Sequence, residues 1–151
     1  MKIRRVCEDE DYKALRLMAV GILEPLYGDQ GKALHEWFSG EGHKYAFVLA
    51  SDREIAGFLS LKANPANPYL KISTLLVFDG HKKLGYGKKL LAKAIRIAKE
   101  LGFGRIKVTV SDSKPESLNF FISAGFVITG KNHGKYKADS TEITLEMEVG
   151  Q

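Results

Sequence analysis

Four lysines and two glycines are concentrated in one eleven-residue segment of the chain, residues 81–91, which reads His-Lys-Lys-Leu-Gly-Tyr-Gly-Lys-Lys-Leu-Leu. Ammonium groups attract anions, and glycines allow a ligand to approach the backbone N–H groups closely. Lysines are unfavourable at the start of a helix, where the macrodipole is already positive, unless an anion binds there. The segment therefore predicts a site for a phosphate-bearing ligand. The alternative is that its lysines are solvated and its glycines only form a turn.

The residues on either side predict that this segment joins a strand to a helix. Residues 69–78 contain a β-branched and apolar run between two prolines and Asp79-Gly80, which is typical of a buried strand. After the segment, apolar residues from Leu90 to Leu101 recur at helical spacing, and basic residues occupy the opposite face. Gly102 is the expected end of this helix. The lysines are therefore expected at a helix N-terminus.

The remaining pattern predicts one mixed α/β (α+β) domain over residues 1–151. We expect strands at residues 2–6, 45–50, 55–61, 105–110, 126–130 and 141–149, and helices at residues 9–19 and 32–38. A capping box at residues 113–116 predicts a further helix that ends before Gly125. Proline and glycine predict a break in residues 21–28, and residues 131–137 form the predicted tip of a hairpin. Two strand–helix–strand units in this order imply a mostly antiparallel sheet with a central parallel pair, flanked by helices.

Spacing excludes two common phosphate-binding loops and favours a third. A P-loop has the pattern Gly-x-x-x-x-Gly-Lys-Ser/Thr. Gly80 and Gly85 have the spacing of its two glycines, but Tyr86 and Gly87 follow where the pattern requires lysine and a hydroxyl residue. The dinucleotide-binding pattern Gly-x-Gly-x-x-Gly does not match either, because after Gly85 and Gly87 it requires glycine at position 90, which is leucine. Residues 82–87, Lys-Lys-Leu-Gly-Tyr-Gly, resemble the acetyl-CoA signature of the GNAT acyltransferase superfamily, Gln/Arg-x-x-Gly-x-Gly/Ala between a strand and a helix. Lysine at position 82 keeps the positive charge of arginine and loses its bidentate fork.

Other segments support the same resemblance, which covers the entire chain. The order of elements is similar to the GNAT fold, residues 55–58 look like its third strand, and residues 120–126 resemble its aromatic-Tyr-x-x-x-Gly-Phe motif. The resemblance implies that acetyl-CoA binds between the strands at residues 69–78 and 105–110. The implied contacts are Leu75, Leu76 and Val77 on the first strand, Lys82, Lys83, Leu84, Gly85, Tyr86, Gly87 and Lys88 at the helix start, and Lys114, Ser117, Phe120 and Phe121 opposite them.

The resemblance also implies a reaction, in which an amine attacks the acetyl thioester with no covalent enzyme intermediate. The thioester oxygen would accept a hydrogen bond from the backbone N–H of Leu75. The tyrosine that usually protonates the thiolate is replaced by Phe121, and a frequent glutamate base is replaced by Lys71. Glu24 and Tyr27, in the segment that forms a substrate lid in the family, are therefore the candidate acid and base. Water, or loop surface without a catalytic role, is the alternative for both.

Several remaining features restrict the partners and the location of the protein. The net charge of +5 favours anionic ligands, but the basic residues are spread over 151 residues and no basic strand interleaved with aromatic residues indicates nucleic-acid binding. The histidines lack partners at metal-ligand spacing, so no metal is expected, although His133 and Tyr136 could face the acceptor. The single cysteine, Cys7, and the lack of an apolar run of roughly 18 residues favour a soluble cytoplasmic protein. Edge strands near the C-terminus allow a homodimer.

Three functions remain open at this point. The first is an acetyl-CoA-dependent N-acetyltransferase that acts on a primary amine of a small molecule or peptide. The second is a non-catalytic acyl-CoA-binding module, because both usual catalytic side chains are replaced. The third is an RNA-directed acetyltransferase or RNA-binding protein, because the chain is basic.

Overall fold

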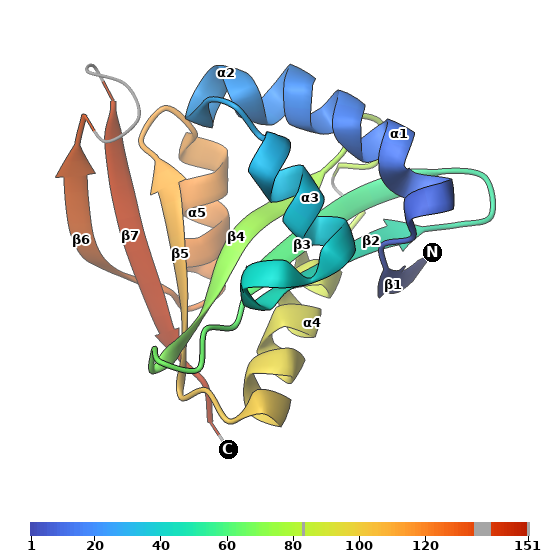
Figure 1. The fold of residues 1–151 in the computed structure, drawn as a ribbon. Coiled ribbons are helices and arrows are strands. Elements are labelled where there is room, and N and C mark those ends of the chain that lie inside the picture. The colour runs from blue at the N-terminus through green and yellow to red at the C-terminus, as the bar shows by residue number, and fades with distance from the viewer. Residues whose placement is uncertain (83, 135–139, 151) are drawn as a thin grey trace.

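The seven strands found in the described part of the chain lie in one mixed sheet (Figure 1). The computed structural model describes residues 1–82, 84–134 and 140–150. The order of strands in the sheet is β1-β2-β3-β4-β5-β7-β6, and only β4 and β5 are parallel. The predicted fold class is therefore confirmed. The strands are β1 (Lys2–Arg5), β2 (Lys44–Ala50), β3 (Ile55–Lys62), β4 (Tyr69–Val77), β5 (Arg105–Ser111), β6 (Val127–His133) and β7 (Thr141–Glu148).

Helices cover both faces of this sheet (Figure 1). α1 (Glu8–Met18) and α3 (Gly31–Ser39) lie on one face, where the Trp37 and Phe58 rings are 4.6 Å apart between their centroids. α4 (Tyr86–Leu101) and α5 (Pro115–Ser123) lie on the other face, where Leu90 and Ala94 are buried against apolar residues of the sheet. The predicted apolar stripe of α4 is therefore the face that it buries, and Gly102 ends the helix in the left-handed region at φ 82°.

The parallel pair separates halfway along its length. β4 and β5 are paired from Tyr69–Arg105 to Ile72–Val108, and no pairing follows. At this point β4 contains a bulge at Ser73, because Ser60 of β3 faces Thr74 and the next residue, Leu61, faces Ile72. A bulge bends its strand and increases the local twist. The bulge accounts for the divergence of β4 from β5, which opens a fork in the middle of the sheet.

The prediction of a break in residues 21–28 was wrong for most of that segment. α1 continues without interruption into a π-helical turn at Ala19–Leu23 and then into α2 (Glu24–Tyr27). The Glu24 N–H donates to the Ala19 carbonyl five residues back, which widens the helix just before Pro25. The wider turn accommodates a proline that would clash with a regular helix, so the chain bends only at Gly28, at φ 86°.

Two further local predictions were wrong. Lys114, not Ser113, precedes the first turn of α5, and the Ser113 hydroxyl lies 2.8 Å from the Ser111 hydroxyl instead of capping the helix. Lys131, Asn132 and His133 belong to β6 and not to a hairpin tip, because they continue its pairing with β7. Residues 135–137 of the predicted tip lie outside the described residues.

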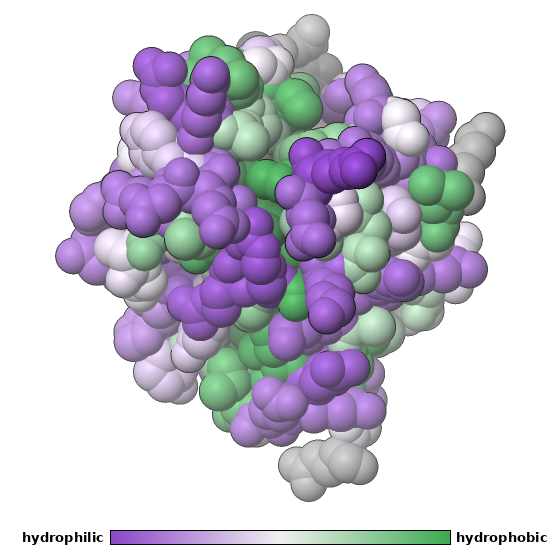
Figure 2. Space-filling view, turned by 90° about the vertical axis from the view of Figure 1, so that its right-hand side faces the viewer, coloured by the Kyte–Doolittle hydropathy of each residue, from purple (hydrophilic) through white to green (hydrophobic). Residues whose placement is uncertain are grey.

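The two edges of the sheet differ in character. Figure 2 faces the edge formed by β1, where hydrophilic residues cover most of the surface and hydrophobic residues show between them. At the opposite edge, Val127 and Ile128 of β6 are 62% and 45% exposed. The homodimer stays a prediction, and β6 is the edge that would form it. Among the described residues, no helix is long and apolar enough to cross a membrane.

Candidate functional site

The start of α4 presents free backbone donors to the space beside β4. Gly85 precedes the helix in the left-handed region at φ 78°, which favours glycine, and the first helical hydrogen bond runs from the Lys89 N–H to the Gly85 carbonyl at 3.2 Å. The N–H groups of Tyr86, Gly87 and Lys88 therefore have no acceptor inside the helix. The first turn contains no acidic residue to neutralise the helix dipole. This end of the helix is suited to an anion.

A cavity of about 340 Å³ adjoins these donors, and we call it the helix-start cavity. Its wall contains most of the residues that the sequence predicted as cofactor contacts, and also Glu116, which the sequence did not indicate. Leu84 is 58% exposed and does not line it, and Lys83 lies outside the described residues. The lining residues are Leu75, Leu76, Val77, Lys82, Gly85, Tyr86, Gly87, Lys88, Glu116, Ser117, Phe120 and Phe121.

Gly87 is required by packing as well as by any ligand. A Cβ atom at this position would lie 3.1 Å from Cε1 and 3.3 Å from Cζ of Phe120. The Phe120 ring in turn packs edge-on against Phe121, with centroids 5.1 Å apart. The absence of a side chain at Gly87 therefore lets α4 and α5 approach each other beside the cavity.

The backbone of β4 faces the fork at Leu75 and Val77. The Phe78 N–H donates to the Ala56 carbonyl of β3, and the Leu76 carbonyl also lies against β3, beside Gly57. Hydrogen-bonded and non-hydrogen-bonded pairs alternate along antiparallel strands, so Leu75 and Val77 direct their N–H and C=O groups away from β3. On that side β5 has already diverged. The Leu75 N–H is thus available to a ligand in the fork, whereas the backbone of Leu76 is not.

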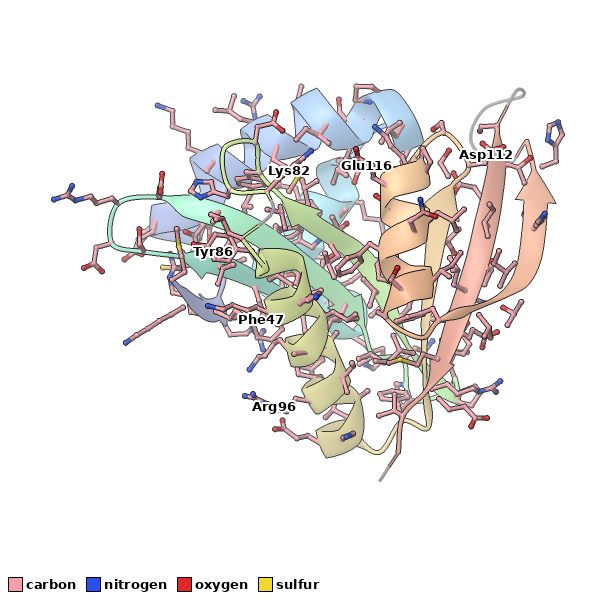
Figure 3. All side chains as sticks on the ribbon, turned by 180° about the vertical axis from the view of Figure 1, so that it is seen from behind. Phe47, Lys82, Tyr86, Arg96, Asp112 and Glu116 are labelled. Carbon is pink, nitrogen blue, oxygen red and sulfur yellow. The ribbon has the colours of Figure 1, made fainter. Side chains whose placement is uncertain are left out.

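A second cavity, of about 410 Å³, occupies the fork itself, and we call it the strand-fork cavity. It adjoins the helix-start cavity because both are lined by Leu75, Leu76, Lys82, Glu116, Ser117 and Phe121. Lys114 lines this second cavity only. Figure 3 shows Lys82 and Glu116 on opposite sides of the space between the α4 start and α5. The hydroxyl-bearing residues of its wall are Tyr27, Ser73, Thr74, Thr109, Ser111, Ser113 and Ser117.

The structure separates the two candidate acid–base residues. Tyr27 lines the strand-fork cavity. Glu24, one helical turn earlier, lines instead a cavity of about 590 Å³ between α1 and α3, and its carboxylate accepts a hydrogen bond from the Gln30 N–H at 3.2 Å. The sequence predicted that Glu24 and Tyr27 lie on one loop. Residues 19–27 are helical instead, so the two side chains face different cavities. Tyr27 is the better placed of the two for chemistry at the fork.

The other residues considered from the sequence lie farther from the reaction. Phe121 is 4% exposed and stacks edge-on against Phe126, so the position of the family tyrosine is part of the core as well as of the cavity wall. His133 is on the outer strand β6, where its Nδ1 lies 3.0 Å from the Thr141 hydroxyl. Tyr136 lies outside the described residues. Among the residues described, no group of three or more histidine, cysteine, aspartate or glutamate side chains is arranged to hold a metal ion.

One lysine is desolvated beside the bulge of β4. Burial lowers the pKa of Lys44, whose ammonium donates to the Ser73 hydroxyl at 3.4 Å. Ser73 is the bulged residue and also lines the strand-fork cavity. Lys44 therefore contacts the residue at which the fork begins, and does so from β2.

Comparison with known proteins shows similarity in sequence and in fold. The profile of the acetyltransferase (GNAT) family matches residues 12–126. The chain is 26% identical over 95 residues to streptothricin acetyltransferase of Streptomyces lavendulae, covering 63% of this chain and 50% of that protein, so it spans about half the length of that relative. It is 30% identical over 109 residues to YvbK of Bacillus subtilis, an uncharacterized N-acetyltransferase, covering 72% and 68% of the two chains. In fold it is similar to an aminoglycoside 6′-N-acetyltransferase from Enterococcus faecium, with a TM-score of 0.77, 17% identity, and 100% and 98% of the two chains covered.

Proposed function

Because the chain belongs to the acetyltransferase (GNAT) family, we propose that it is an N-acetyltransferase that moves an acetyl group from acetyl-CoA directly to a primary amine of a small molecule or peptide. One observation carries the proposal. The Leu75 N–H, which faces the fork, and the free N–H groups at the start of α4 open onto adjoining cavities. A thioester and a pyrophosphate joined by a pantetheine arm need these two kinds of donor at the two ends of such a space.

The residues of the site fit acetyl-CoA by charge and by shape. Lys82 and Lys88 line the helix-start cavity beside the free N–H groups, where the pyrophosphate would bind. The backbone groups of Leu75 and Val77 are free of β3 and would pair with the pantetheine amides as a neighbouring strand does. Among the described residues that line the two cavities, Glu116 is the one that is acidic, and it lies across from Lys82.

Acetyl-CoA supplies an activated acetyl group, and the residues of the chain orient it and handle protons. In the proposed reaction the amine nitrogen forms a bond to the thioester carbon, the carbon–sulfur bond breaks, and the proton lost by the amine is balanced by the one that the thiolate gains. The Leu75 N–H donates to the thioester oxygen as it becomes negative. Tyr27, the phenol in the wall of the strand-fork cavity, protonates the departing thiolate directly or through water.

The acceptor class is part of the proposal. Streptothricin and aminoglycosides, the acceptors in the names of two similar proteins, are small molecules. We therefore favour a small-molecule amine over a peptide.

Two measurements test this function in sequence. Calorimetric titration with acetyl-CoA is expected to give one-to-one binding at micromolar concentration, on the order of −8 kcal/mol. A panel of primary amines is then screened for release of the CoA thiol. Binding with turnover supports the transferase, whereas binding with no thiol release across the panel would indicate the non-catalytic module. No acetyl-CoA binding up to millimolar concentration would refute both.

A further inference from the structure

We propose that Glu142 of β7 binds one amino group of the acceptor in its protonated form while a second, neutral amino group attacks the thioester, so that the protein selects acceptors that carry more than one amino group. This inference rests on the proposed function, because it assigns the acceptor side of the same site. The residue is a charged side chain that is only 2% exposed, in a position that neither the sequence nor the family resemblance indicated. Glutamate is rarely buried this deeply, because removal of a carboxylate from water costs several kcal/mol.

A small cavity connects Glu142 to the fork. This cavity has a volume of about 180 Å³, and Tyr27, Asp112 and Glu142 are among the residues that line it. It shares Tyr27, Ser111 and Ser113 with the strand-fork cavity, so the two spaces adjoin. A molecule in the small cavity would therefore be next to the proposed thioester position.

The register of the strands places Glu142 close to the height of the proposed oxyanion donor. The fork opens after the pair Ile72–Val108. Ser111 is three residues beyond this pair on β5, roughly 10 Å past the point of divergence, whereas the bulge at Ser73 places Leu75 only two β3 residues beyond it, roughly 7 Å. Ser111 is directly opposite Glu142 on β7. Glu142 thus lies one strand beyond the far side of the fork, within about one residue of the height of Leu75.

The side-chain alternation of β7 directs Glu142 to the acceptor side. The neighbouring pair, Val110 and Ile143, is buried in the core that α4 and α5 cover. Ser111 and Glu142 therefore face the opposite side of the sheet, which is the side of Tyr27. The acyl donor would enter between α4 and α5, and an acceptor would meet it from the face that carries Glu142.

Two other acidic residues on or beside β7 hold parts of the sheet in place. Asp112 accepts a hydrogen bond from the Thr141 N–H at 3.2 Å, which fixes the start of β7. Glu146, four residues along the same face of β7, forms an ion pair with Arg105 at 3.6 Å. Glu142 has local contacts of its own, and its position and burial are what suit it to an ammonium group. In a site of low dielectric constant, a carboxylate favours the charged amine over a neutral ligand of the same shape.

The test compares Glu142→Gln with Glu148→Gln in a binding measurement that does not require turnover. Both substitutions remove one charge from the same face of β7, but Glu148 is exposed at the end of the strand, outside the cavity. The probes are 1,4-diaminobutane and its neutral counterpart 1,4-butanediol, titrated into the protein with and without coenzyme A. We expect the wild type and Glu148→Gln to bind the diamine and not the diol, and Glu142→Gln to bind the diamine at least tenfold more weakly.

Turnover then separates this inference from the proposed function. With acetyl-CoA, Glu142→Gln is expected to raise the KM for the diamine at least tenfold while its affinity for acetyl-CoA stays unchanged. Equal KM values, or equal diamine affinities, in wild type and Glu142→Gln would overturn the role of Glu142 even if the protein is an acetyltransferase. Diamine binding that depends on Glu142 without any acetyl-CoA binding would keep this inference and refute the transferase. If Glu142→Gln does not fold, Glu142→Asp keeps the charge and shortens the reach, and an unchanged diamine affinity in that variant would overturn the inference.

Discussion

At the scale of single residues, the site depends on backbone groups as much as on side chains. Leu75 has an unremarkable side chain, and its proposed role comes from an N–H group that the alternation of β4 directs into the fork. The side chains at the positions where the family has its tyrosine and glutamate are Phe121 and Lys71. The proposed reaction relies on positioning and on backbone hydrogen bonding, which require neither a tyrosine nor a glutamate at these two positions.

Leu75→Pro tests the proposed oxyanion donor. The substitution removes the N–H that faces the fork and no hydrogen bond to β3, so turnover is expected to fall about 10²–10³-fold while the fold is retained. Leu75→Ala keeps the N–H and is expected to keep most of the activity. Leu76→Pro, which removes a hydrogen bond to β3, is expected to unfold at a clearly lower temperature than Leu75→Pro. Steady-state kinetics and thermal unfolding measure these effects, and wild-type turnover in Leu75→Pro would contradict the assignment.

Asp11 gives a prediction about stability and pH. This side chain is 1% exposed, and it accepts hydrogen bonds from both Nη1 and Nη2 of Arg4, at 2.7 and 2.9 Å, and from the Cys7 N–H at 2.7 Å. Burial opposes its ionisation, but the hydrogen bonds from Arg4 and Cys7 outweigh burial and lower the pKa of Asp11. Asp11→Asn is therefore expected to reduce the free energy of unfolding by about 1.5–3 kcal/mol at neutral pH.

The pH dependence of this effect has a definite sign. Because the pKa of Asp11 is lower in the folded state than in the unfolded state, its stabilisation is complete above the unfolded value of about 3.9 and disappears as the pH falls through the folded value. Urea unfolding of wild type and Asp11→Asn should therefore show a smaller difference at pH 3 than at pH 7. Asp9→Asn, an exposed change in the same helical turn, is the control. An equal difference at both pH values would show that the stabilisation does not come from the charge.

At the scale of elements, α4 joins two roles in one helix. Its apolar stripe holds the sheet together through Leu90 and Ala94, and its N-terminus presents Lys88 and three free N–H groups to the helix-start cavity. The basic first turn weakens the isolated helix. An amphipathic helix buried along its length is stable enough to carry such a turn, because packing provides most of its stability.

Lys82→Glu tests the anion site at the α4 start. Lys82 lines both cavities and its side chain is 57% exposed, so the reversed charge would face the pyrophosphate without a large effect on the fold. We expect acetyl-CoA to bind about tenfold more weakly, a difference of about 1.4 kcal/mol that decreases as salt is added. Lys99→Glu, an exposed change of the same charge in the last turn of α4, should leave the affinity unchanged. Equal losses in both variants, measured by calorimetry, would indicate a general charge effect instead of a site.

At the scale of the whole molecule, the sheet consists of two parts that meet at the fork. One part is β1-β2-β3-β4 and the other is β5-β7-β6, and among the described residues the strands of the two parts are paired only from Tyr69–Arg105 to Ile72–Val108. Beyond these pairs, the backbone of Leu75 and Val77 lacks a neighbouring strand. A ligand that fills the fork would complete the missing pairing between the two parts.

Hydrogen exchange tests this role of the ligand. With acetyl-CoA at 100 times its Kd, the protein is expected to gain about 2.7 kcal/mol of stability. The amides of Leu75 and Val77, which face the fork, should show protection beyond this general gain, whereas those of β2 and β3, already paired on both sides, should show only the general gain. Protection that is uniform over the sheet would mean that the ligand does not bind in the fork.

The sequence by itself determined most of the elements and predicted an anion site at the start of α4. Strand and helix periodicities are local, so the strands, α4 and α3 were predicted to within one to three residues at most ends, and the lysines and glycines of residues 82–88 indicated the helix start directly. Two predictions from local sequence patterns were wrong, because another local interaction was more favourable. Pro25 predicted a break that a π-turn avoids, and Ser113 predicted a cap although its hydroxyl contacts Ser111 instead.

Only the tertiary structure decided which residues meet at the fork. The direction of the Leu75 N–H depends on the pairing of β4 with β3, the separation of Glu24 from Tyr27 depends on the unbroken helix, and the burial of Glu142 depends on the register of β7 against β5. None of these carries a sequence signal, because pairing between strands is set by contacts between residues that are distant in the chain. The alternation of polar and apolar residues predicts that the side chain of Glu142 lies on the face of β7 opposite the core. Only the fold shows that a cavity lies on that face.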